Sequence, residues 1–288
     1  MSNIKVLVCI HKDDVYLKNK DYLPIHVGKA LSNIDLGIQG DDTGDNISIK
    51  NPSYCELTAM YWAWKNLKNI DYIGLCHYRR YFDFHKQCRK GFPYTIFPTN
   101  ECQNKDISIP ESIIKKLEKG YAIVPEKICH NTSLFNNYCT CHISDDLKTL
   151  ECIINETCDK KYTDAFDKIM NRTNELFPCN MFILKWNDFD KYCTWLFNIL
   201  SEAEKRINIE HYSNYQKRIF GFMGERLLNI FLYAENIKTS KYPLIYFSNE
   251  EEEKISYIKQ KYRNLLYKIS MMFSMSPKFG LNKKHMYQ

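Results

Sequence analysis

Short apolar segments of strand length alternate with amphipathic segments along most of this 288-residue chain. The segments with the composition of buried strands are IKVLVCI (4–10), DYIGLCHY (71–78), GYAIVPEK (120–127) and PCNMFILKW (178–186). The segments with helical spacing of apolar residues are 53–67, 110–119, 144–156, 186–206 and 221–236. This alternation predicts an α/β fold in which a largely parallel central sheet is flanked by helices.

The helix expected at 53–67 carries the clearest start signal. It follows a loop rich in Gly, Asp and Asn, and Ser53 stands three residues before Glu56, which is the spacing of a capping box. Apolar residues then recur at helical intervals and give the helix one face for the core. The pattern predicts that Glu56 caps this helix, and such a structural role requires no chemistry.

Two of the expected strands end in chemically functional residues. These are His11 and Lys12 after the first strand, and His77, Tyr78, Arg79 and Arg80 at the end of the second. Because ligands of open α/β sheets bind at the carboxyl ends of strands, we expect both segments to meet at one edge. Arginine binds phosphate through paired charge-assisted hydrogen bonds, which predicts an anion site there. The alternative is that Arg79 and Arg80 form surface ion pairs. Neighbouring strand residues point to opposite faces, so we do not expect them to share one role.

Acidic residues in two other segments are further candidates. Asp41, Asp42 and Asp45 share one loop, where carboxylates can bind a metal ion or sugar hydroxyls, or simply stabilise turns. Glu225 lies in GFMGERLL, where two glycines could bring the backbone and a carboxylate close to a ligand. A structural ion pair between Glu225 and Arg226 is the alternative.

A third group of polar residues lies between the middle helices. His142, Asp145 and Asp146 could position an acceptor or act as a base, although the two aspartates also suit a helix N-terminus. Cys139, Cys141 and His142 could contribute to a zinc site, but no second ligand pair at zinc-like spacing is present. The sequence contains no P-loop, GxGxxG or HExxH motif, and we assign no metal ligands.

The amino-terminal segment and the cysteines indicate an intracellular protein. MSNIKVLVCIHK lacks a basic region followed by a long apolar stretch, and no apolar run approaches the roughly 20 residues that span a bilayer. The 12 cysteines are scattered without a CxxC pair, which favours reduced core thiols over a disulfide framework. We therefore expect a cytoplasmic location.

Positive charge is concentrated in the tail at 251–288, which we separate from a main domain at 1–250. Residues 254–288 contain eight Lys or Arg and no Asp or Glu, whereas the residues before them contain 32 basic and 34 acidic side chains. Within 256–273, apolar residues share one helical face: Ile258, Tyr262, Leu265, Leu266, Ile269, Met272 and Phe273. Such a helix either packs this face on the body or rests on an anionic membrane surface.

Several segments together resemble a bacterial family of exopolysaccharide and capsular-polysaccharide biosynthesis proteins, now placed among the glycosyltransferases and including galactofuranosyltransferases. The segments are YLPIHVGKAL, GIQGDDTGDNIS, NPSYCELTAMYWAWKNL, DYIGLCHYRRYF, PCNMFILK and GFMGERLLNIFL. The resemblance covers roughly residues 4–248 and leaves out the tail. It implies a GT-A-like fold that binds a nucleotide sugar at the strand ends.

The resemblance also suggests roles for the candidate residues. HYRRY stands where many GT-A enzymes carry a DxD metal motif, so Arg79 or Arg80 could stabilise the leaving diphosphate directly. No cofactor is assigned, although the aspartates of the loop could still recruit Mg²⁺ or Mn²⁺. The donor-binding candidates are His11, Lys12, Asp41, Asp42, Glu56, His77, Tyr78, Arg79 and Arg80. The acceptor-binding candidates are His142, Asp145, Asn180 and Met181, and the candidate bases are Glu225 and Asp146.

Together these features predict a glycosyltransferase that moves a sugar, such as galactose or galactofuranose, from a UDP-linked donor. The acceptor would be a saccharide, free or lipid-linked, of a capsule or O-antigen, and the tail suggests peripheral contact with the inner face of the plasma membrane. The alternative is a catalytically silent sugar- or nucleotide-binding subunit of a polysaccharide-synthesis complex. The near-neutral body and the lack of a recognisable nucleic-acid module argue against nucleic-acid binding.

Overall fold

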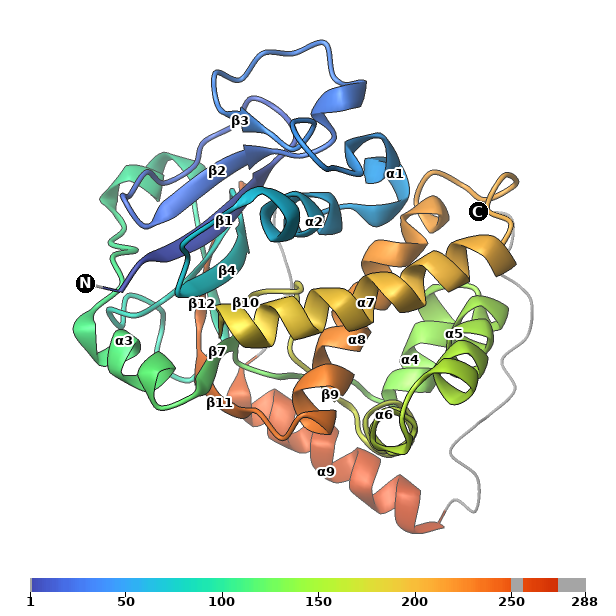
Figure 1. Ribbon diagram of the computed structural model, residues 1–288. Helices are drawn as coiled ribbons and strands as arrows, with labels where there is room; N and C mark the ends of the chain where they lie inside the picture. Colours follow the sequence, from blue (N-terminus) through green and yellow to red (C-terminus); the bar gives the residue numbers. More distant parts are fainter. Residues whose placement is uncertain (1, 250–255, 274–288) are drawn as a thin grey trace.

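The computed structural model describes residues 2–249 and 256–273, and its centre is a twisted mixed sheet with helices on both faces (Figure 1). The sheet order is β11-β7-β10-β4-β1-β2-β3, with β5, β6 and β12 attached beside this path. The strands of the path are β1 (Ile4–Ile10), β2 (Tyr22–His26), β3 (Gln39–Gly40), β4 (Tyr72–His77), β7 (Tyr121–Pro125), β10 (Phe182–Lys185) and β11 (Lys238–Tyr242). The attached strands are β5 (Arg80–Phe82), β6 (Tyr94–Phe97) and β12 (Leu244–Phe247). The expected α/β fold with a mostly parallel sheet is confirmed.

The directions of the strands bring several chain segments to one edge of the sheet. β1 pairs in parallel with β4, and Cys9 lies opposite His77 at the end of that pairing. β10 runs antiparallel to β4, with Phe182 opposite Leu75. The start of β10 therefore lies at the same edge as the ends of β1 and β4, which is where a doubly wound sheet binds ligands.

Alternate residues of the central strands pack into two hydrophobic clusters, one on each face of the sheet. In β1, Leu7 and Cys9 belong to the larger cluster, whereas Val6, Val8 and Ile10 belong to the smaller one. This division follows from the two-residue period of a strand, and burial on both faces explains the nearly continuous apolar sequence of β1 and β4.

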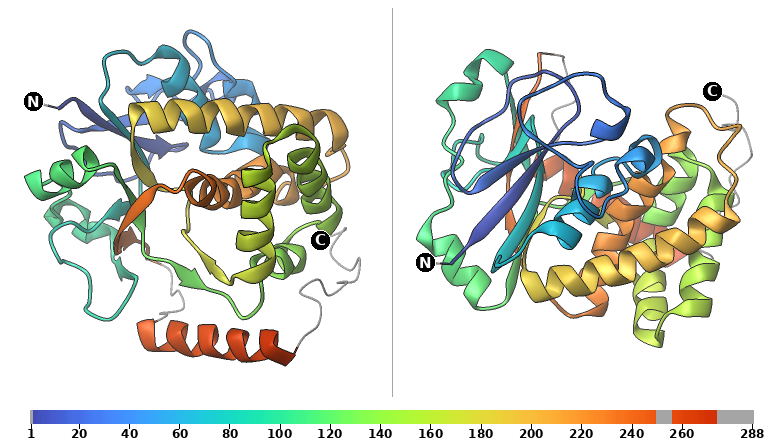
Figure 2. Two further views of the ribbon diagram at one scale, coloured as in Figure 1. Left: turned by 60° about the horizontal axis from the view of Figure 1, so that its bottom comes forward. Right: turned by 45° about the horizontal axis from the view of Figure 1, so that its top comes forward.

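The larger cluster is covered by most of the helices, and the smaller one by α3 (Glu111–Glu118) and the strands β5, β6 and β12 (Figure 2). The helices contributing to the larger cluster are α1 (Asn51–Tyr54), α2 (Leu57–Asn66), α4 (Leu134–Cys141), α5 (Ser144–Thr157), α6 (Lys160–Phe166), α7 (Trp186–Arg206) and α8 (Ile219–Ala234). A small second sheet pairs β8 (Ile128–Cys129) with β9 (Glu175–Leu176). In the described part of the chain, no helix combines the length and the apolar character needed to cross a membrane.

The capping box predicted before α2 is wrong. Ser53 lies inside the short helix α1, and its hydroxyl donates a hydrogen bond to the Lys50 carbonyl. Cys55 then adopts a positive φ of 51° and separates α1 from α2. Glu56 occupies the N-cap position of α2, but its side chain makes no capping hydrogen bond. Its carboxylate is therefore available to the site described next.

Candidate active site

The run from His77 to Arg80 forms a tight hairpin at the end of the sheet. β4 ends at His77, Tyr78 and Arg79 form the turn, and Arg80 begins β5 directly opposite His77. The chain thus reverses where the sequence suggested a continuing strand. Arg79 lies in the turn and Arg80 in the returning strand, so both can face the same cavity. The expectation that the two point to opposite faces of one strand does not apply here.

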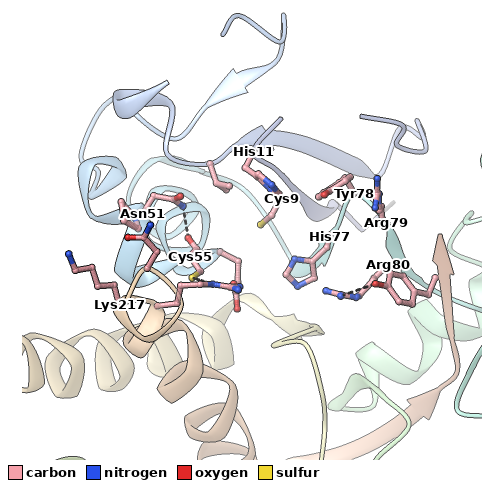
Figure 3. A pocket seen from close by; sticks show the side chains of 15 residues that line it. Cys9, His11, Asn51, Cys55, His77, Tyr78, Arg79, Arg80 and Lys217 are labelled. Atoms are coloured by element: carbon pink, nitrogen blue, oxygen red, sulfur yellow. Dashed lines mark hydrogen bonds between the residues drawn. The ribbon is translucent and has the colours of Figure 1, made fainter. Parts of the chain in front are cut away.

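A cavity of about 570 Å³ opens beside this hairpin, large enough for a small organic ligand (Figure 3). It is lined by Cys9, His11, Val27, Asn51, Pro52, Cys55, Glu56, His77, Tyr78, Arg79, Arg80, Asn214, Lys217, Arg218 and Tyr246. The ends of β1 and β4 form one wall, and α1 with the segment before α8 forms another. The expected meeting of His11 with the HYRR run is therefore confirmed, and the rings of His11 and Tyr78 pack edge to face at 5.5 Å.

Cationic side chains reach this cavity from two directions. Arg79 forms an ion pair with Asp14 at 2.7 Å, a carboxylate that also lies 3.5 Å from Lys12. Arg80 lies over the Tyr246 ring, 4.7 Å from its centroid. Lys12 itself is not among the lining residues, and its ammonium group pairs with Asp14 instead.

The second group of cations comes from the segment that leads into α8. Lys217 and Arg218 line the cavity, and Arg218 Nε donates a hydrogen bond to Cys55 Sγ at 3.4 Å. Sequence reasoning missed both residues, and it also missed Asn214 and Tyr246. The adjacent pair Lys217-Arg218 ahead of an apolar helix repeats the pattern of Arg79-Arg80 after an apolar strand, and this was the available signal.

His77 presents a neutral ring to the cavity. Burial, aided by the nearby charge of Arg80, lowers the pKa of His77 to about 4. Its Nε2 lies 2.8 Å from the Cys179 carbonyl, which can only accept, so Nε2 carries the proton. Nδ1 is then a hydrogen-bond acceptor and suits a sugar hydroxyl.

Glu56 is the one carboxylate among the cavity's lining residues in the described chain. It is half-buried, and burial raises its pKa to about 7 despite a hydrogen bond from Asn180 Nδ2 at 3.2 Å. The nearby charge of Glu225 acts in the same direction as burial. A carboxylate with a near-neutral pKa, set among cations in a cavity, has the properties of a general base.

Asn180 and Met181 are placed by an unusual backbone turn before β10. Cys179 and Asn180 both have positive φ, 66° and 54°, which is uncommon for non-glycine residues. Asn180 is fully buried and holds Glu56, whereas Met181 packs in the smaller hydrophobic cluster. Neither side chain lines the cavity. Asn180 therefore acts on the site through Glu56.

Glu225 does not line the cavity, but it contacts the turn that holds Asn180, the partner of Glu56. Its carboxylate accepts hydrogen bonds from the Cys179 backbone N–H and from Arg226 Nη1, both at 2.6 Å. A methyl group added at Gly224 would lie within 3.2 Å of Leu57 and Asn180 side-chain atoms, so this glycine allows close packing of α8 within the protein. The geometry gives Glu225 the role of fixing the Cys179–Asn180 turn that carries the partner of Glu56.

His142, Asp145 and Asp146 lie outside the cavity lining. The His142 ring stacks on Phe222 at 4.0 Å, and burial lowers its pKa to about 4. Asp146 is buried and accepts a hydrogen bond from the Tyr212 hydroxyl at 2.8 Å, while burial raises its pKa to about 6. Asp145 is exposed and pairs with Lys148. The structure does not bring these three residues to the edge where the donor candidates meet.

The aspartates of the long loop do not fit a metal site at the cavity. Asp41 is fully buried, and its carboxylate accepts hydrogen bonds from the backbone N–H groups of Gly28 and Lys29 and from the Ser48 hydroxyl. Asp42 and Asp45 are exposed and do not line the cavity. Across residues 2–249 and 256–273, no group of three His, Cys, Asp or Glu side chains could hold a metal ion, and this includes Cys139, Cys141 and His142.

Residues 5–236 match a protein-family model described as a domain of unknown function, DUF4422. The chain belongs to this family. The DUF4422 match includes every cavity residue except Tyr246 and ends before β11.

The fold of this DUF4422 chain is similar to a solved structure, the WbbM bifunctional glycosyltransferase in its apo form. The TM-score is 0.76 and the sequence identity 29%, over 86% of this chain and 46% of that one. The chain thus spans less than half the length of the WbbM chain. No curated protein matches it. The resemblance of the DUF4422 chain to a polysaccharide-biosynthesis glycosyltransferase family is confirmed.

Proposed function

We propose that this chain is a glycosyltransferase that uses a nucleoside-diphosphate sugar, with UDP as the nucleotide. The observation that carries the proposal is the cavity at the ends of β1 and β4, where four cations surround one carboxylate of near-neutral pKa. The similarity to the WbbM glycosyltransferase supports it independently, because it rests on the whole fold rather than on the cavity.

The cations match the charge that develops during sugar transfer. When the bond between the sugar C1 and the phosphate oxygen breaks, negative charge accumulates on the departing UDP. Arg80 lines the cavity from the hairpin at the sheet edge and Arg218 from the segment before α8, so the two can bind the diphosphate between them. Fixed cations aimed at a developing charge stabilise the transition state strongly. In this proposal they perform the task that a metal ion performs elsewhere.

We assign the general base to Glu56 in place of Glu225 or Asp146. The acceptor oxygen forms a bond to C1 of the sugar, the bond from C1 to the UDP oxygen breaks, and the acceptor hydroxyl proton passes to Glu56. Glu56 lines the cavity, whereas the Glu225 carboxylate is occupied by Arg226 and by the Cys179 N–H. The neutral His77 ring is placed to orient the sugar.

The family resemblance extends the proposal to the substrates. A UDP-hexose, galactose in its pyranose or furanose form, is the proposed donor. The proposed acceptor is a saccharide of a bacterial surface polysaccharide. The same cavity in a catalytically silent subunit would bind the donor without transferring the sugar, and turnover separates the two functions.

Binding of UDP tests the nucleotide site directly. We expect UDP at about 100 times its Kd to stabilise the native protein by roughly 2.7 kcal/mol, because the ligand binds only the folded state. For a domain of this size, that is a rise in Tm of about 5–10 °C. The rise should persist in EDTA and should exceed that given by CMP, which has a single phosphate. A rise that required Mn²⁺ would contradict the role given to the arginines, and no response to any nucleotide would refute the site.

A further inference from the structure

The helix α9 (Tyr257–Phe273) is attached to the body through its polar side. Gln260 is buried, and its side-chain oxygen accepts a hydrogen bond from the Cys129 N–H of β8 at 2.6 Å. Asn264 donates a hydrogen bond to Glu175 of β9 at 2.8 Å, and Tyr267 is buried on the same side. These contacts lie one turn apart along the helix, so they fix which face points inward.

The opposite side of α9 is an exposed apolar stripe. Its residues and their exposed fractions are Ile258 80%, Tyr262 60%, Leu265 55%, Leu266 47%, Ile269 43% and Met272 81%. At 100° per residue they span about a third of the helix circumference, centred away from Gln260 and Tyr267. The apolar face that the sequence predicted is therefore turned outward, and α9 packs on the body through its polar side instead of through this face. The side chain of Phe273 lies outside the described residues.

Basic side chains border this stripe on both sides. On a helical wheel Lys261 and Lys268 fall beside Leu265 and Met272, whereas Lys259 falls at the other border. Both Lys261 and Lys268 are exposed, and the helix contains no Asp or Glu. An apolar stripe between basic borders is the pattern of a helix that lies in the interface of an anionic membrane.

We propose that α9 is a lipid-binding helix that holds this protein against an anionic membrane surface. The stripe enters the boundary between head groups and acyl chains, and the lysines contact lipid phosphates. The charges that border the stripe favour an anionic membrane over a second copy of the chain as its partner. Two copies joined through their stripes would bring the lysine borders of both helices together without a carboxylate from either helix to offset them. Figures 1 and 2 show α9 along the outside of the molecule, where a flat surface can reach it.

The position of α9 gives this contact a consequence for the reaction, which rests on the proposed function. A smaller cavity of about 180 Å³ shares Arg80 and Tyr246 with the main one, and Ile128 of β8 also lines it. The neighbouring residue, Cys129, is the one bonded to Gln260 of α9. Binding to the membrane through α9 would thus hold the side of the active site nearest this smaller cavity close to a lipid-linked acceptor.

Flotation of the full chain with lipid vesicles tests the proposal. We expect binding to vesicles of phosphatidylglycerol and phosphatidylethanolamine, and at least tenfold weaker binding to pure phosphatidylcholine. The double variant Leu265→Ser/Ile269→Ser should bind anionic vesicles at least tenfold more weakly. The control Leu31→Ser/Ile34→Ser removes two comparably exposed apolar residues elsewhere and should bind like the wild type. The variant Lys261→Gln/Lys268→Gln should lose about fivefold in affinity for anionic vesicles per lysine replaced. The control Lys148→Gln/Lys160→Gln removes two surface lysines outside α9 and should keep the wild-type affinity.

The readouts separate this proposal from its rivals and from the transferase function. A UDP-induced rise in Tm that is the same in every variant would show that the variants fold, and vesicle binding does not depend on transfer. Wild-type protein that fails to bind anionic vesicles, or a Leu265→Ser/Ile269→Ser variant that binds them unchanged, would overturn the proposal. A dimer that this double variant dissolves, without lipid binding by the wild type, would assign the stripe to a second copy and also overturn it.

Discussion

Replacing Glu56 with glutamine is expected to lower kcat for sugar transfer by about 10²- to 10⁴-fold, the usual contribution of a general base. The substitution keeps the size of the side chain and its capacity to accept a hydrogen bond from Asn180. UDP affinity should therefore change by no more than a few-fold. Transfer assayed at saturating donor, together with calorimetric titration of UDP, separates the loss of catalysis from a loss of binding.

The pH dependence gives the same substitution a second signature. Because burial raises the pKa of Glu56 to about 7, the wild-type rate should rise with pH and level off above about 7, where the carboxylate is ionised. The residual rate of Glu56→Gln should lack this rise. Glu225→Gln should retain the rise but shift it to lower pH, because that carboxylate positions the Cys179–Asn180 turn and its charge helps to raise the pKa of Glu56. If Glu225→Gln removes the pH-dependent rise and Glu56→Gln preserves it, the two roles are reversed.

Stability should move in the opposite direction to activity in Glu56→Gln. The pKa of Glu56 is raised in the folded state, so its destabilising charge is absent below the unfolded value of about 4.5. The penalty develops as pH rises and is complete above about 7. Denaturant unfolding at pH 8 should show Glu56→Gln to be more stable by about 1–3 kcal/mol, a gain that disappears near pH 4.

Replacing Arg80 or Arg218 with glutamine is expected to weaken UDP binding by about 10- to 100-fold. A hydrogen bond between charged groups contributes about 1.5–3 kcal/mol, and each arginine faces the cavity from a different wall. Arg79→Gln should have a smaller effect, because Asp14 already offsets much of the Arg79 charge. Arg172→Gln provides the matched control, because Arg172 is exposed, pairs with Asp167 and does not line the cavity; its UDP affinity should be that of the wild type.

Calorimetric titrations of these variants against UDP and uridine sharpen the test. The losses should be large for UDP and small for uridine, since the arginines are proposed to bind phosphate rather than the base. Equal losses for both ligands would mean that the substitutions disturb the cavity as a whole. A wild-type affinity in the Arg80→Gln variant would remove the hairpin from donor binding.

The position of the site could be predicted from sequence because parallel strands determine it. The apolar segments at β1 and β4 identify buried strands, and parallel neighbours must end at the same edge. His11 and the HYRR run therefore had to meet. The turn within that run was not visible, because the pairing of Arg80 with His77 depends on β12 binding β5, which comes from distant sequence.

Residues supplied by loops and by local capping geometry could not be placed in the same way. Lys217 and Arg218 reach the cavity because α8 packs against α1. The spacing of apolar residues predicts each helix but not the packing of one helix against the other. Glu56 matched a capping box, but the positive φ of Cys55 breaks the helix there and releases the carboxylate. In α9 the apolar period predicted the helix correctly, whereas polar contacts with β8 and β9 decided which face is buried.

The most direct test of the central claim is sugar transfer itself. Purified protein should be incubated with UDP-galactose or UDP-galactofuranose and saccharide acceptors, free and lipid-linked, and the products followed by UDP release and mass spectrometry. We predict that one hexose is added to the acceptor for each UDP released, and that the reaction proceeds in the presence of EDTA. The same reaction should be at least 100-fold slower with Glu56→Gln. Tight UDP binding without transfer to any acceptor would contradict the account and identify the chain as a binding subunit.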